Sequence, residues 1–148
     1  MLTIGDLNHP PPGRVAFDRP VPEIPAQALE LVPALARRAE DIVLTKRGWS
    51  AFSADRLHEM LREASVTQIM LAGLATSYGI ESTARRAYDL GYNVVIVTDA
   101  INNPQRESHD NSITRVFPAL GQLANTDEIL ALLGRMRAHT PVTEDAEQ

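Results

Sequence analysis

Cysteine is absent from the 148-residue chain, and this excludes disulfide bonds, thiolate metal ligands and a cysteine nucleophile. A surplus of basic residues is absent too, because 14 Lys and Arg stand against 19 Asp and Glu, for a net charge of −5. This balance argues against a protein that binds nucleic acid through its phosphates. Small molecules and other proteins are therefore the expected partners.

Long apolar segments are also missing. No apolar run approaches the roughly 20 residues of a transmembrane helix, and the first residues, MLTIGDLNHPPPG, lack the basic start and apolar core of a signal peptide. We therefore expect no membrane partner and a cytoplasmic location. With 44% apolar residues, the chain is long enough for one domain that buries about two-thirds of its unfolded-chain surface.

Proline divides the chain into unequal parts. Six of the ten prolines fall between residues 10 and 25, where each lacks a backbone N–H and biases the preceding residue away from helix. The sequence predicts a proline-rich extended arm over residues 1–27, a folded domain over 28–138 and a disordered tail over 139–148.

Short apolar runs alternate with helical patterns in the central part. Four segments are typical of buried strands: DIVLTK, QIMLAG, NVVIV ending at Asp99, and GQLAN. Between and after them, helices are expected with Ser53 as N-cap, after TSYG with Gly91 at the C-terminal end, over 105–117, and with Thr126 as N-cap. The expected fold class is α/β, a Rossmann-like three-layer α/β/α arrangement with a mainly parallel sheet.

In open parallel sheets, ligands bind beyond the carboxyl ends of the strands. The residues in those places are Lys46, the loop 74–79, and Asp99 with Asn102 and Asn103. Backbone N–H groups at a helix start in TSYG suit a carboxylate or another oxyanion. Asp99 itself is expected to be a structural carboxylate that caps the next turn.

Cofactor motifs are not found. No GxGxxG follows a strand and no GxxxxGK[ST] exists, so dinucleotide and P-loop nucleotide sites have no support. The histidines lack metal-ligand spacing and are expected at the surface: His9, His58, His109 and His139. We expect neither a cofactor nor a metal.

Three stretches carry a resemblance to a known family: DIVLTKRGWSAFSADRLHEML, LAGLATSYGIESTARRAYDLGYNVVIVTDA and ESHDNSITRVFPALGQLANTDEIL. Together they span roughly residues 31–133 and resemble the isochorismatase-like cysteine hydrolases, which include isochorismatases, nicotinamidases and related amidohydrolases. In that family a cysteine thiolate attacks the substrate, an Asp acts as base, and a Lys favours the thiolate.

The resemblance places Lys46 at the lysine position and Gly79 at the cysteine position, so the nucleophile is missing. The expected ligand-binding residues are Ala75, Thr76, Tyr78, Gly79 and Trp49. Thr76 and Tyr78 are candidate hydroxyl donors, while Trp49, like Phe52, is either a core or a pocket-wall residue. The resemblance also implies a cis peptide near Leu74–Ala75. No apolar strand is recognised ahead of Asp6 or Asp18, so the catalytic Asp is unidentified. The chain resembles a sub-group with glycine in place of the nucleophile, and the N-terminal part of the fold is expected to be truncated.

Three functions follow as hypotheses. The first is a catalytically impaired family member that binds a small polar or carboxylated metabolite. The second is a hydrolase that activates water through a His or Asp side chain or a bound metal. The third is a structural or interaction subunit of a homo-oligomer. Oligomerisation is expected in any case, because a missing first strand would leave a sheet edge that a second copy, through exchange of the arm, can cover with an interface above about 1,000 Å².

Overall fold

A short N-terminal strand begins the fold. The structure, a computed structural model, describes residues 2–4, 27, 30–46 and 48–138. Strand β1 (Leu2–Ile4) pairs in parallel with β2 (Leu44–Lys46), and Ile4 lies opposite Lys46. The chain therefore leaves β1 at the edge of this small sheet where β2 presents Lys46.

This strand corrects the sequence-based expectation. The expectation that no strand precedes Asp6 is wrong, because Leu2–Ile4 form β1, while the division into an arm over 1–27, a domain over 28–138 and a tail over 139–148 stays a prediction. Three apolar or β-branched residues ahead of Gly5 are enough to pair, but too few to produce a recognisable period. Asp6 follows the strand by two residues. It lies outside the described residues, as do the remainder of the expected arm over 5–26 and the expected tail over 139–148.

A second parallel sheet forms the centre of the molecule, with the strand order β3-β4-β5. Its strands are β3 (Gln68–Leu74), β4 (Asn93–Asn102) and β5 (Gln122–Ala124). The expected end of the central strand at Asp99 is wrong, because β4 continues to Asn102. The added length contains a register shift opposite Leu71 to Gly73, where Gly73 has a φ of 120° that favours glycine.

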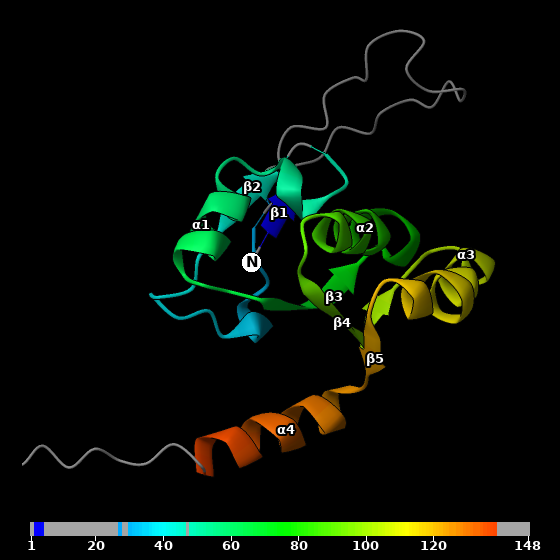
Figure 1. Ribbon diagram of the computed structural model, residues 1–148. Helices are drawn as coiled ribbons and strands as arrows, with labels where there is room; N and C mark the ends of the chain where they lie inside the picture. The colour runs from blue at the N-terminus through cyan, green and yellow to red at the C-terminus, as the bar shows by residue number, and fades with distance from the viewer. Residues whose placement is uncertain (1, 5–26, 28–29, 47, 139–148) are drawn as a thin grey trace, which may run out of the picture.

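Helices flank this sheet and confirm the expected α/β class. Figure 1 shows α2 and α3 together on one side of β3, β4 and β5, and α4 on the other. The helical elements are η2 (Pro33–Leu35), η3 (Ala51–Ser53), α1 (Leu57–Glu63), η4 (Thr76–Ile80), α2 (Glu81–Asp89), α3 (Arg106–Asn111), η5 (Ser112–Val116), η6 (Phe117–Ala119) and α4 (Thr126–Ala138). Within the described ranges, every helix is too short or too polar to span a bilayer.

Two helix starts differ from the sequence-based expectation. Ser53 is not the N-cap of α1, because it is the last residue of η3 and α1 begins only after Arg56. The α4 cap is Asn125 rather than Thr126: the Asn125 side chain accepts from Glu128 N–H, and the Glu128 carboxylate accepts from Asn125 N–H. This reciprocal pair satisfies two backbone donors that a single hydroxyl cap would leave open. Gly91 follows the end of α2 as expected, with a φ of 85°.

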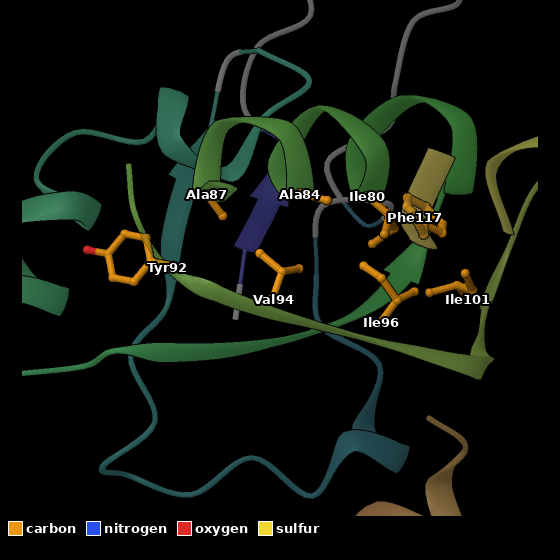
Figure 2. Close-up of a cluster of buried hydrophobic side chains, with 8 residues drawn as sticks. All are labelled: Ile80, Ala84, Ala87, Tyr92, Val94, Ile96, Ile101 and Phe117. Carbon is orange, nitrogen blue, oxygen red and sulfur yellow. The ribbon is translucent and has the colours of Figure 1, made fainter. Parts of the chain in front are cut away.

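The core lies between α2 and β4. Figure 2 shows Ile80 of η4 and Ala84 and Ala87 of α2 facing β4. The facing side chains of β4 are Val94, Ile96 and Ile101, with Tyr92 at one end of the cluster and Phe117 at the other. Ala84 and Ala87 are fully buried, and their small side chains let the helix approach the strand closely. The core therefore fixes the helix that follows the 74–79 loop against the central strand.

Candidate functional site

Lys46 ends β2 and turns its ammonium back onto the following loop. Nζ donates to the carbonyl oxygen of Gly48 at 2.6 Å and to that of Trp49 at 3.0 Å. The side chain is half-buried, and desolvation by burial lowers the pKa of Lys46 below that of an ordinary lysine. Both of these acceptors are backbone carbonyls, so no carboxylate among the described residues neutralises the ammonium by direct hydrogen bonding.

The loop after β3 passes through a cis peptide between Leu74 and Ala75, as the family resemblance implies. It then forms the π-helical turn η4 over Thr76–Ile80. Ala75 O accepts from the N–H groups of Tyr78 and Ile80, both at 3.2 Å, and Asn103 Oδ1 accepts from Ser77 N–H at 3.3 Å. An oxyanion would compete with these acceptors, so the turn offers fewer donors than a bare helix start.

Gly79 lies within this turn, beside the loop that Lys46 contacts. A Cβ placed on Gly79 would be 3.4 Å from Leu74 O and 3.7 Å from Trp49 O, which is ordinary van der Waals contact. Trp49 O is also an acceptor of the Lys46 ammonium. The structure therefore brings the sequence-predicted residues Lys46, Trp49 and Gly79 together around one carbonyl oxygen.

Thr83 ties the two loops to each other. Its hydroxyl donates to Gly79 O at 2.6 Å and accepts from the N–H of Ala51 at 2.8 Å. Thr83 and Ala51 are buried, so these bonds are shielded from water. One side chain of α2 thus fixes the turn that holds Gly79 against the loop that holds Lys46.

An aromatic pair stands at the exposed side of the same region. Trp49 and Tyr78 meet edge to face, with ring centroids 5.0 Å apart and an interplanar angle of 80°. Trp49 is 60% exposed and Tyr78 is 40% exposed. The two rings therefore present apolar surface and a phenol hydroxyl to solvent next to Gly79.

Thr76 differs from the other sequence-predicted ligand residues, because it is completely buried. Its hydroxyl is 2.8 Å from His109 Nδ1. A ligand would reach this hydroxyl only by displacing that hydrogen bond.

His109 on α3 and Asn103 just after β4 support the turn, a role that sequence reasoning did not assign to either residue. Asn103 is buried, and its Oδ1 accepts from both the N–H and the hydroxyl of Ser77. His109, expected at the surface, is half-buried against Thr76. The position of Asn103 after a strand was the available signal; nothing in the spacing of His109 indicated its partner.

A cavity of about 300 Å³ lies beside these two residues. Its lining also includes Asn102, Arg106 and Asp110. Asp99 does not belong to this site: its carboxylate accepts from the N–H and hydroxyl of Thr126 at 2.9 Å and 3.0 Å. Its expected structural role is therefore correct, although it holds the start of α4 rather than the next turn. In the parts of the chain that the structure describes, no group of three or more His, Asp or Glu is placed to hold a metal ion.

Comparison with known proteins places this geometry in context. The isochorismatase domain model matches residues 6–128. The uncharacterized isochorismatase family protein YwoC of Bacillus subtilis (strain 168) is 39% identical over 108 residues, which are 73% of this chain and 57% of that protein. The uncharacterized isochorismatase family protein YecD of Escherichia coli O157:H7 is 40% identical over 100 residues, which are 68% of this chain and 53% of that protein.

A solved structure shares the fold. An isochorismatase family protein from Burkholderia thailandensis superposes with a TM-score of 0.79 and 34% identity, covering 90% of this chain and 72% of its own. The chain spans a little over half the length of the two curated relatives.

Proposed function

The chain belongs to the isochorismatase family, and from this premise we propose that it binds a small carboxylated or otherwise polar metabolite at the Lys46–Gly79 site without cysteine-type hydrolysis. Gly79 takes the place of the family's nucleophile, and no cysteine exists elsewhere in the chain. Because a glycine has no side chain to attack a substrate, binding is the property that remains. We assign the chain to the glycine-bearing sub-group of the family on the same ground.

One observation carries this proposal: a half-buried ammonium lies beside the turn that holds Gly79. Lys46 donates to two carbonyl oxygens, and an ammonium has three donors. Partial burial strengthens the attraction between this cation and an anion, because water screens the pair less. A carboxylate placed over Gly79 would gain that attraction while its apolar part rests on Trp49 and Tyr78.

Removing the ammonium should weaken anion binding. We expect Lys46→Ala to reduce the affinity for benzoate by roughly 5- to 150-fold, about 1–3 kcal/mol, as is typical for loss of a hydrogen bond to a charged group. Isothermal titration measures the change. Arg86→Ala is the matched control, because it removes an exposed cation in the last turn of α2 and should bind normally. Equal affinities in the two variants would remove Lys46 from the site.

The same interaction sets the pH dependence. Desolvation lowers the pKa of Lys46, so its positive charge is lost at a lower pH than in an ordinary lysine. Benzoate affinity should therefore fall as the pH rises through this pKa, while the neutral analogue benzamide shows no such fall. Lys46→Arg, which stays charged, should move the fall beyond the accessible range.

Turnover assays separate this proposal from a hydrolase that works without a thiolate. Isochorismate, nicotinamide and N-carbamoyl compounds are the substrates suggested by the family resemblance. We expect none to be consumed at a rate that depends on Lys46. Lys46-dependent turnover of any of them by the wild-type chain would replace the binding proposal with the hydrolase.

A homo-oligomer is a second candidate role, favoured by the surface of α4. Ile129, Leu132, Leu133 and Met136 form a stripe along this helix, and the last three are exposed. Strand β3 is also an edge of its sheet, and its last residue, Leu74, is exposed. A second copy of the chain is the occupant we propose for the stripe.

Sedimentation velocity at micromolar concentration tests this role. We expect a dimer or larger species for the wild type and a monomer for Leu133→Glu, because a charge in a dry interface is costly. Ala131→Glu, on the same helix outside the stripe, should keep the wild-type mass. A folded wild-type monomer would disprove the oligomer.

A further inference from the structure

A second cavity lies at the amino ends of strands β3 and β4, and we propose that it binds a small oxyanion, either a carboxylate or a phosphate. It has a volume of about 590 Å³ and is bordered by His58 and Arg62 of α1, Thr67 ahead of β3, Leu90 and Tyr92 ahead of β4, and Asn93 at the start of β4. This volume lies within the roughly 300–1,000 Å³ of small-molecule sites.

The position makes this cavity independent of the Lys46 site. Thr67 immediately precedes β3, Asn93 is the first residue of β4, and Asn93 N–H donates to Thr67 O at 2.9 Å. The cavity therefore lies at the amino ends of the strands, whereas Lys46 is the last residue of β2 and Gly79 comes after β3. Figure 2 shows Tyr92 at the amino end of β4, far along the strand from Ile101.

Arg62 supplies a cation near two carboxylates that form their ion pairs with another arginine. Glu59 and Glu63 flank Arg62 on α1, but both pair with Arg56, at 3.4 Å and 4.0 Å. Arg62 forms no ion pair with any residue in the described ranges. A guanidinium in this state presents a fork of N–H donors that matches the two oxygens of a carboxylate or phosphate.

His58 adds a second donor in a fixed orientation. Its Nδ1 is 2.9 Å from the hydroxyl of Tyr92, and Tyr92 is buried and stacked on Phe52 with centroids 5.8 Å apart. When the tyrosine hydroxyl donates to Nδ1, the proton of the neutral imidazole is on Nε2, which can donate to a ligand. The aromatic packing thus fixes the ring beside Arg62.

These features define the ligand by chemistry. Two neighbouring nitrogen donors, one of them always charged, favour an oxyanion. Leu90 provides half-buried apolar surface for the remainder of the molecule. A carboxylate with a short apolar part and a phosphate ester both meet these conditions.

Titrations with inorganic phosphate and with acetate test the site, observed through the ring signals of His58 in ¹H–¹⁵N spectra. We expect saturable shifts of His58 in the wild type and at least a ten-fold weaker affinity in Arg62→Ala, with the same ranking of the two ions. The ion that saturates at the lower concentration identifies the head group. Arg62 is exposed on α1, so its removal should leave the fold and the thermal midpoint unchanged.

Two control variants keep the cavities apart. Lys46→Ala should leave the His58 shifts as in the wild type, and Arg86→Ala should do the same. Shifts that are linear in ion concentration, or equal in Arg62→Ala and Arg86→Ala, would overturn the site. Shifts abolished by Lys46→Ala but not by Arg62→Ala would overturn it too, and would assign the anion to the Lys46 site instead.

Discussion

Gly79→Cys should convert a chain that iodoacetamide leaves unlabelled into one that it alkylates, with little gain in hydrolysis. The wild type has no cysteine to react. A Cβ at position 79 meets its neighbours at ordinary contact distances, so the variant should fold normally. The Cβ at position 79 would lie 3.7 Å from Trp49 O, which accepts from the Lys46 ammonium, so the new thiol would be close to a cation that favours the thiolate.

Gly134→Cys is the matched control for this labelling. Position 134 lies on α4 with nothing within 4 Å of a Cβ, so its thiol should have ordinary reactivity. We expect alkylation at position 79 to be about three- to ten-fold faster at pH 7, since a lower thiol pKa raises the thiolate fraction but reduces its nucleophilicity. Equal rates would mean that Lys46 does not act on position 79.

Hydrolysis should remain low because a thiolate alone does not complete the reaction. The family also uses an Asp as base, and the direct hydrogen-bond acceptors of Lys46 among the described residues are carbonyls only. Efficient turnover of nicotinamide by Gly79→Cys would show that a base is present after all. Asp6, two residues beyond β1, is then the side chain to test, by adding Asp6→Asn to that variant.

Phe117→Ala should destabilise the fold by about 3–5 kcal/mol, which lowers the thermal midpoint by on the order of 10 °C. Phe117 is completely buried in the cluster with Ile96 and Ile101 and is the largest fully buried side chain in the described ranges. Removing the ring leaves a cavity, because the surrounding residues relax only partly into the space. Denaturant unfolding measures the change in the free energy of unfolding.

Tyr88→Ala provides the comparison for that loss. Tyr88 is an aromatic residue of α2 that is 56% exposed, so its truncation should change the free energy of unfolding by less than about 0.5 kcal/mol. A similar small effect for Phe117→Ala would contradict the described core. Phe117→Leu, which keeps most of the volume, should lie between the two.

Periodicity predicted the central elements well. The apolar runs became β2, β3, β4 and β5, and the parallel α/β class is confirmed. Boundaries were less accurate where a hydrogen bond from elsewhere decides them. The α4 cap depends on a reciprocal pair between Asn125 and Glu128, and the end of β4 depends on a shift in its pairing with β3.

The candidate site was predictable only in part. Position after a strand and the family resemblance together located Lys46, Trp49 and Gly79. Contacts between distant segments were not visible in the sequence: Thr76 and His109 are 33 residues apart, and Ala51 and Thr83 are 32 residues apart. Each pair is joined by one hydroxyl, and no spacing rule marks which of several Thr residues will make such a bond.

The bonds that shape the turn around Gly79 have a consequence for how this protein can change. Thr83 holds the Gly79 carbonyl, Asn103 holds Ser77, and His109 holds Thr76, so the turn is secured by backbone atoms and by other side chains. At position 79 the backbone carbonyl holds the turn in place, whereas any reactive group would have to come from a side chain. A reactive side chain could therefore be lost or gained at position 79 during evolution without any change in the bonds that hold the turn.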